Sequence, residues 1–192
     1  MVKKREAIDE KYKWDLTTIF ATDEAFEAEL AEVLTALEDA RNLAGTLTDS
    51  AENLLAVTDT ELALMQRVEK LYVYASMKND QDTTVSLYQE YQAKVTALYA
   101  KFSEVFAFYE PEFMTLSQER FAQFVIDHPK LQTYGHFFEQ LFDRKAHVLS
   151  SAEEALLAGA SEIFGAGAET FEILDNADIV FPTIRDAQGQ DV

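Results

Sequence analysis

Apolar residues recur every three or four positions along most of this chain, which is the spacing of one face of an α-helix. The first such stripe predicts a helix from about Asp23 to Leu43. Thr22 or Asp23 can cap its start, and Gly45 suits its end because glycine readily adopts the left-handed conformation found after helices. Its apolar face is expected to consist of Phe26, Leu30, Val33, Leu34 and Leu37.

Two further helices are predicted between residues 51 and 80. Ser50 can cap a short first one, and Thr58-Asp59-Thr60-Glu61 has the spacing of a capping box that would begin the second. The second helix should end near Asn79-Asp80, where short polar side chains compete for backbone hydrogen bonds. Its expected core residues are Leu64, Val68, Leu71, Tyr72 and Ala75.

The most regular pattern lies between Thr83 and Tyr109, where apolar and aromatic residues alternate by three and four positions. They are Tyr88, Tyr91, Val95, Leu98, Phe102, Val105 and Tyr109. Such a heptad seam can form an intermolecular coiled coil or pack on a neighbouring helix of the same chain. We favour an intramolecular hairpin because the preceding helix offers a matching stripe across a short turn. The helix should stop or bend at Glu110-Pro111.

A second set of helices is expected after Pro111. Ser117 can cap one, Pro129 suits the first turn of the next, and overlapping capping boxes at 150–154 begin another. The stretch 179–184 is a strand candidate, and 186–190 has the composition of a turn. The expected fold is therefore all-α, with antiparallel helical hairpins or a bundle in two lobes and the start of a small β-hairpin at the C-terminus. The three expected segments are 1–110, 111–178 and 179–192.

The opening segment Lys11–Phe20 is rich in aromatic residues and is expected to pack on the core. The chain of 192 residues carries 35 acidic and 16 basic side chains, for a net charge of -19. Such a surface repels phosphate backbones, so nucleic-acid binding is not expected. There is neither a signal peptide pattern nor an apolar run long enough to cross a membrane, and there are no cysteines. These features favour a cytoplasmic protein without membrane contact.

Residues with catalytic or metal-binding potential are few and scattered. The three histidines are His128, His136 and His147, and none has a partner at HExxH spacing. His136 and Glu139 could share a helix face, but two ligands are a weak metal signal. The sequence contains no G-x-S-x-G elbow and no phosphate-binding glycine loop. We therefore expect no catalytic, cofactor-binding or metal residue in this chain.

Two polar clusters stand out, at Tyr74–Thr83 and at Arg144–Ser150. Both fall where helices are expected to end, so capping and helix-dipole effects explain them most simply. Docking against another part of a larger protein is the alternative.

These clusters also carry a resemblance to a known family. Together with several other segments in the same order, they are similar to oligoendopeptidase F along essentially the whole chain. The matching segments are Trp14-Asp15-Leu16-Thr17, Tyr74–Thr83, Pro111-Glu112-Phe113, Arg144-Lys145-x-His147-x-Leu149-Ser150 with Glu153 and Leu156-Leu157-Ala158, and Asn176-Ala177-Asp178-Ile179-x-Phe181 through Asp186 and Gly189.

The resemblance implies an N-terminal part of a zinc metallopeptidase related to thimet oligopeptidase. In that family the zinc is held by an HExxH helix and a downstream glutamate, so it would belong to a catalytic domain beyond residue 192. The present chain would form one wall of a channel for short peptides, would contact its own catalytic domain, and would be inactive alone. The alternative is a self-contained helical protein-interaction module.

Overall fold

The computed structural model describes residues 7–145 and, beyond them, residues 166–167, 170–171, 174, 184–185 and 187–189. The chain divides into two compact units, Met1–Lys145 and Ala146–Val192. The predicted helix over 151–164 and most of the predicted strand over 179–184 lie outside the described residues. The β-hairpin at the C-terminus therefore stays a prediction, whereas the all-α fold is confirmed.

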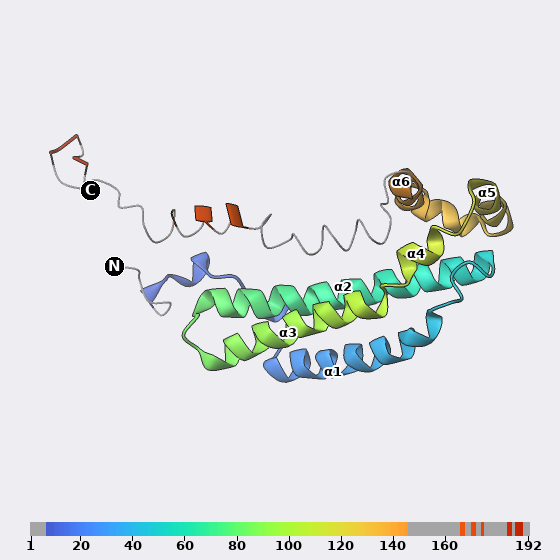
Figure 1. Ribbon diagram of the computed structural model, residues 1–192. Coiled ribbons are helices and arrows are strands. Elements are labelled where there is room, and N and C mark those ends of the chain that lie inside the picture. Colours follow the sequence, from blue (N-terminus) through green and yellow to red (C-terminus); the bar gives the residue numbers. More distant parts are fainter. Residues whose placement is uncertain are drawn as a thin grey trace. The chain divides into compact units, whose positions relative to one another are not determined.

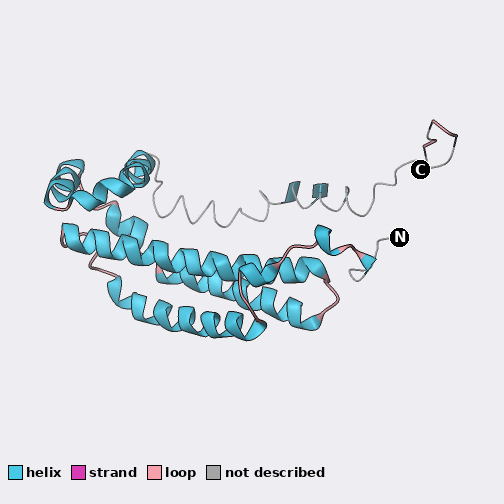
Figure 2. Ribbon diagram, turned by 180° about the vertical axis from the view of Figure 1, so that it is seen from behind, coloured by secondary structure: helices cyan, strands magenta, loops and turns pink. Residues whose placement is uncertain are grey.

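Three long helices run side by side in the first unit (Figures 1 and 2). They are α1 (Asp23–Ala40), α2 (Ala51–Gln81) and α3 (Ser86–Val105). The first begins as predicted, because the Thr22 hydroxyl accepts a hydrogen bond from the backbone N–H of Ala25 at 3.2 Å. A short 3₁₀ helix at Arg41–Leu43 follows it, so the predicted end is close to the observed one.

Helix α2 is continuous, and the prediction of a new helix at Thr58 is wrong. Thr58 is fully buried within α2, and its hydroxyl donates to the carbonyl oxygen of Leu54 at 2.7 Å. A capping residue needs an extended backbone, which would break the helix where its neighbours pack into a core. Ser50 does cap the helix, accepting from the N–H of Asn53 at 3.1 Å.

The heptad seam of α3 faces α1 and α2 of the same chain, so the intramolecular interpretation holds. Helix α3 ends at Val105, several residues before the predicted stop at Pro111. The first apolar cluster lies between the three helices and consists of Leu16, Phe20, Phe26, Leu30, Val33, Leu37, Ala40, Leu64, Val68, Leu71, Tyr74, Ala75, Tyr91, Val95, Leu98, Phe102, Val105 and Phe106.

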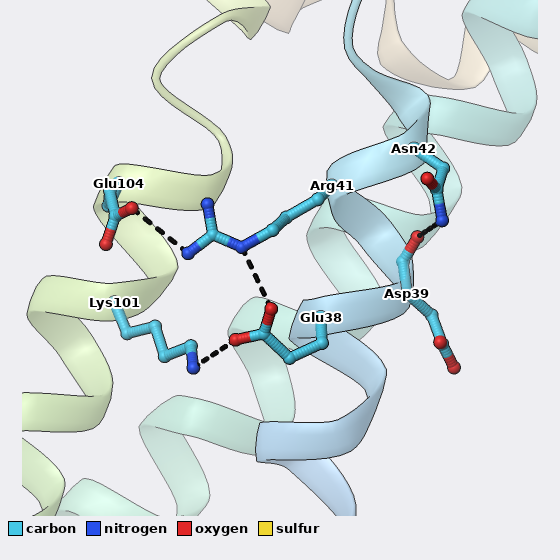
Figure 3. A network of polar contacts seen from close by, with 6 residues as sticks. All are labelled: Glu38, Asp39, Arg41, Asn42, Lys101 and Glu104. Atoms are coloured by element: carbon cyan, nitrogen blue, oxygen red, sulfur yellow. Dashed lines mark hydrogen bonds and ion pairs between the residues drawn. The ribbon is translucent and has the colours of Figure 1, made fainter.

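Ion pairs join α1 to α3 at the edge of this cluster (Figure 3). Glu38 pairs with Lys101, and Arg41 lies 3.0 Å from both Glu38 and Glu104. These side chains are largely exposed, so each pair contributes at most about 1 kcal/mol.

A second apolar cluster forms around the N-terminal part of α2. It is built with α4 (Tyr109–Phe113), α5 (Gln118–Asp127), a 3₁₀ helix at Pro129–Tyr134 and α6 (Gly135–Lys145). Its buried members are Leu47, Ala51, Leu54, Leu55, Val57, Tyr109, Phe113, Leu116, Phe124, Leu131, Phe138 and Leu141. The rings of Phe113 and Phe138 stack at 5.3 Å in its centre.

The predicted caps of the second cluster are confirmed, but the effect of Pro111 differs. Ser117 accepts from the N–H of Arg120 at 3.2 Å, and Pro129 lies in the first turn of its helix. Pro111 lies in the first turn of α4, where its missing N–H has no intrahelical partner to lose. Because α2 contributes to both clusters, a lobe boundary at residue 110 stays a prediction.

Four aromatic residues, two in the opening segment and two on α2, differ in burial from the expected core. In the opening segment Leu16 and Phe20 are buried, but Trp14 is 78% exposed and Tyr12 is 73% exposed. On α2 the expected Tyr72 is exposed and Tyr74 is buried instead. The buried arc of α2 faces α1 and α3 at once, and Tyr72 falls outside that arc.

Candidate functional site

A partly buried polar cluster joins the start of α1 to the C-terminal part of α2. The Tyr74 hydroxyl donates to Asp23 Oδ1 at 2.6 Å, and Lys78 Nζ lies 2.9 Å from the same oxygen. The ammonium group of Lys78 also lies 5.4 Å from the centre of the Tyr74 ring and 5.3 Å from that of Tyr88. Asp23 is the first residue of α1, so the positive end of the helix dipole also stabilises its carboxylate.

The electrostatics of this cluster keep it charged and hydrogen-bonded. Partial burial acts to raise the pKa of Asp23, but the hydrogen bonds from Tyr74 and Lys78 and the Lys78 charge outweigh it, so the pKa is lowered. Burial, followed by the Asp23 carboxylate, raises the pKa of Tyr74. Tyr74 is therefore protonated at neutral pH and acts as a hydrogen-bond donor.

A hollow of about 650 Å³ opens beside this cluster, between the opening segment and the end of α2. Trp14 lines it, and both of its lysines already have carboxylate partners: Lys78 pairs with Asp23, and Lys13 pairs with Glu10 at 2.5 Å. The hollow therefore exposes the Trp14 indole, and neither of its lysines lacks a carboxylate partner. That chemistry suits docking or packing better than acid–base catalysis, which needs a group free to exchange a proton.

The polar cluster predicted at Arg144–Ser150 is described only in part, because residues 146–150 lie outside the described residues. Arg144 lies 3.1 Å from Glu110, at the start of α4. Lys145 donates to the carbonyl oxygen of Leu116 at 3.1 Å. The two basic side chains thus tie the end of α6 to α4 and to the loop after it.

A second buried polar group lies between α2 and α4. The Thr58 hydroxyl donates its only proton to Leu54, so Tyr109 must donate in the 2.6 Å bond between the two hydroxyl groups. Nearby, Glu61 Oε2 is buried and has no hydrogen-bond partner among the described residues. Burial, with a smaller effect from Glu110, raises the pKa of Glu61 to about 7. A carboxyl group of this kind can titrate near neutral pH.

The histidines do not converge in the described part of the chain. His136 is exposed and lies 3.8 Å from Glu139, as the spacing predicted. His128 follows α5, and its Nδ1 atom is buried without a partner among the described residues. His147 lies outside the described residues. Within the parts of the chain that are described, no three or more metal-ligating side chains gather.

None of the described helices is long and apolar enough to cross a membrane.

Sequence reasoning missed the contacts that join distant elements. Asp23 and Tyr74 are separated by 51 positions, so no local spacing could reveal their hydrogen bond. The burial of Glu61 was missed because the residue was assigned to a helix cap. The sequence did offer a reason to single out Trp14, because it belongs to the Trp14-Asp15-Leu16-Thr17 segment on which the family resemblance rests.

Comparisons with known proteins agree with that resemblance. The sequence profile of the family described as Oligopeptidase F matches residues 112–181. Group B oligopeptidase PepB of Streptococcus agalactiae is 60% identical over 100% of this chain. The plasmid oligoendopeptidase F of Lactococcus lactis subsp. cremoris is 54% identical over 99% of it. The chain spans 32% of the length of each of these two relatives.

A solved structure extends the agreement to three dimensions. The crystal structure of oligoendopeptidase-F from Enterococcus faecium superimposes with a TM-score of 0.66 at 40% sequence identity. The match covers 88% of this chain and 33% of that one. The chain therefore belongs to the oligoendopeptidase F family and corresponds to the N-terminal region of its members.

Proposed function

We propose that this chain is the N-terminal, channel-wall domain of a zinc-dependent oligoendopeptidase that hydrolyses short peptides. The observation that carries the proposal is the 60% identity to an oligopeptidase along the whole chain, of which the chain spans 32%. Identity at that level over every element implies the same fold and the same place in the protein.

The residues that the structure describes do not form a zinc site. No group of three metal-ligating side chains occurs in the described parts. His136 lies beside Glu139, and the buried Nδ1 of His128 has no hydrogen-bond partner among the described residues. We assign no zinc ligand and no catalytic step to this chain. Zinc bound in the remainder of such an enzyme would polarise the scissile carbonyl group and activate water.

The role left to this chain is structural: its helices would limit access to the peptide channel. Two exposed surfaces support that role. Trp14 and the hollow beside it are available to the rest of the enzyme, and the outer face of α2 and α3 is available to a peptide. Its partners would be its own catalytic domain and the peptide substrate. A cytoplasmic location and the lack of nucleic-acid or membrane partners stay predictions.

The test compares residues 1–192 with the full-length enzyme from the same gene. Peptides of five to about fifteen residues are incubated with each, and cleavage is followed by mass spectrometry. We expect cleavage by the full-length enzyme alone and its loss with a chelator. Cleavage by residues 1–192, or one tight equivalent of zinc in a titration of that chain, would contradict the proposal.

The alternative of a self-contained interaction module is distinguished by the reading frame after codon 192. An open frame that encodes HExxH supports the peptidase. A stop codon there supports the module.

A further inference from the structure

An apolar groove runs along the outer face of α2 and α3, on the side away from the first apolar cluster. The residues that line it have the same spacing on both helices: Glu69, Tyr72 and Val73 on α2, and Thr96, Tyr99 and Ala100 on α3. Residues three and four positions apart share a helix face, so each helix lines the groove with one continuous face. The groove has a volume of about 700 Å³, within the range of about 300–1,000 Å³ typical of ligand sites.

Aromatic side chains form the floor of this groove. The Tyr72 and Tyr99 rings meet edge to face at 6.2 Å between their centres. They remain 41% and 38% exposed, and the adjacent Val73 is 45% exposed. Exposed aromatic faces accept aliphatic and aromatic side chains, and they also attract cations.

Glu69 brings one carboxylate to the lining of the groove. Each cation of α2 and α3 is engaged with α1, or with the segment before it. Arg67 pairs with Glu29, Lys78 with Asp23, Lys94 with Glu27 and Lys101 with Glu38, while Lys70 lies over the Phe20 ring. Within the part of the chain that the structure describes, Glu69 forms no ion pair with any of these five cations. The groove therefore carries one unpaired carboxylate, in a chain whose net charge is -19.

Glu69 also connects the groove to a second hollow along α2. That hollow has a volume of about 590 Å³ and is lined by Leu62, Met65 and Tyr134 among others. Leu62 to Val73 spans about 16 Å at ~1.5 Å per residue of helix. An extended peptide of about five residues covers the same length at ~3.3 Å per residue.

We propose that this surface binds an extended peptide segment of about five residues, with a lysine or arginine at Glu69 and apolar side chains on the Tyr72–Tyr99 floor. The inference rests on the proposed function, because it takes the ligand to be a peptide. The groove is a holding site for the substrate and takes no part in bond cleavage.

Binding is measured by calorimetry on residues 1–192 and on the full-length enzyme made inactive by a chelator. The probes are the acetylated, amidated pentapeptide Leu-Tyr-Lys-Leu-Tyr and its analogues with norleucine or glutamate in place of lysine. We expect saturable binding of the lysine peptide, at least tenfold tighter than that of the glutamate peptide. Glu69→Gln should weaken the lysine peptide at least fivefold and leave the norleucine peptide unchanged.

The matched control is Glu52→Gln, which removes the same charge from an exposed position on the same helix and should change neither affinity. Tyr99→Ser should weaken both the lysine and the norleucine peptides, with its fold checked by circular dichroism. The proposal is overturned if no saturable binding occurs, or if Glu69→Gln behaves as Glu52→Gln does.

The same experiment identifies other occupants of the groove. Concentration-dependent dimerisation that Tyr99→Ser abolishes would mean that a second copy fills the groove, and the proposal would fall. If residues 1–192 bind the peptide and the full-length enzyme does not, the enzyme covers its own groove, and the proposal would fall as well.

Failure of the proposed function gives a different result. If the full-length enzyme binds the peptide through Glu69 but cleaves no peptide, the peptidase assignment fails and the groove stands. If it cleaves peptides but Glu69→Gln leaves the lysine-to-norleucine ratio of kcat/KM unchanged, the groove fails and the peptidase stands.

Discussion

The Tyr74 hydroxyl donates a 2.6 Å hydrogen bond to Asp23 Oδ1 and so ties the first residue of α1 to the C-terminal part of α2. The Tyr74 ring is only 2% exposed, so loss of its hydroxyl leaves a partly buried carboxylate with one donor fewer. Tyr74→Phe should lower the free energy of unfolding by about 1–2 kcal/mol. Urea unfolding followed by circular dichroism measures this. Tyr72→Phe makes the same chemical change on an exposed ring and should stay within about 0.5 kcal/mol of the parent chain. Equal effects of the two variants would contradict the prediction.

The Thr58 and Tyr109 hydroxyl groups should be energetically coupled, because Tyr109 donates to Thr58 in a buried site. Thr58→Val strands the Tyr109 hydroxyl and should cost about 1–3 kcal/mol, whereas Tyr109→Phe leaves Thr58 bonded to Leu54 and should cost less. The double variant should cost less than the sum of the single variants. A double-mutant cycle of urea unfolding measures the coupling. Strict additivity would show that the two groups do not interact.

Glu61 should make the stability of the chain depend on pH. Its pKa is about 7 in the folded chain, against an ordinary value of 4.5. Because the folded pKa is raised, the protonated form is favoured by folding. Stability is therefore retained below about pH 4.5, falls as the pH rises through the interval to about 7, and stays low above it. The full shift corresponds to at most about 3 kcal/mol at 1.36 kcal/mol per unit, and partial exposure of Glu61 reduces this to roughly 1–2 kcal/mol.

Replacement of Glu61 by glutamine removes this titration. Glu61→Gln should be more stable than the parent chain by roughly 1–2 kcal/mol at pH 8 and nearly equal to it at pH 4. Thermal and urea unfolding across that range measure the difference, with Glu52→Gln as the control for a lost charge on α2. A variant that is less stable at pH 8 would show that Glu61 is charged and stabilising in the folded chain.

Glu112 should hold the loop between α1 and α2. Its carboxylate accepts the N–H of Gly45 at 2.5 Å and that of Leu47 at 3.2 Å. Glutamine keeps one acceptor oxygen and places an amide donor against the other N–H, so Glu112→Gln should cost about 1–2 kcal/mol. Glu139→Gln, on an exposed carboxylate of α6, is the matched control and should stay within about 0.5 kcal/mol. Thermal unfolding of the two variants and the parent chain measures these differences in stability.

Local chemistry predicted the helix starts well. Thr22 and Ser117 act as caps because a capping bond joins residues three positions apart and depends little on the rest of the fold. The capping box at Thr58 has the same spacing and failed. There the chain gains more by keeping α2 intact, since Leu54, Leu55 and Val57 reach the second cluster only from a helix.

Other features depend on which helices lie beside one another. Tyr72 and Tyr74 are equally hydrophobic in a sequence pattern, and only the positions of α1 and α3 decide which one is buried. The outer groove is invisible for the same reason, because Glu69 and Tyr99 approach each other only once α2 and α3 form their hairpin. The five cations of α2 and α3 contact α1 or the segment before it and form no ion pair with Glu69, and no spacing along the chain encodes this choice.

Helix α2 belongs to both apolar clusters without a break. A hinge between the clusters would have to open its backbone hydrogen bonds between about Thr58 and Leu64, at the cost of the packing on either side. The two clusters should therefore move as one rigid body, and amide exchange along the middle of α2 should be as slow as global unfolding. Any opening and closing of a peptide channel in the full enzyme would then take place at the edges of this unit and leave its interior unchanged.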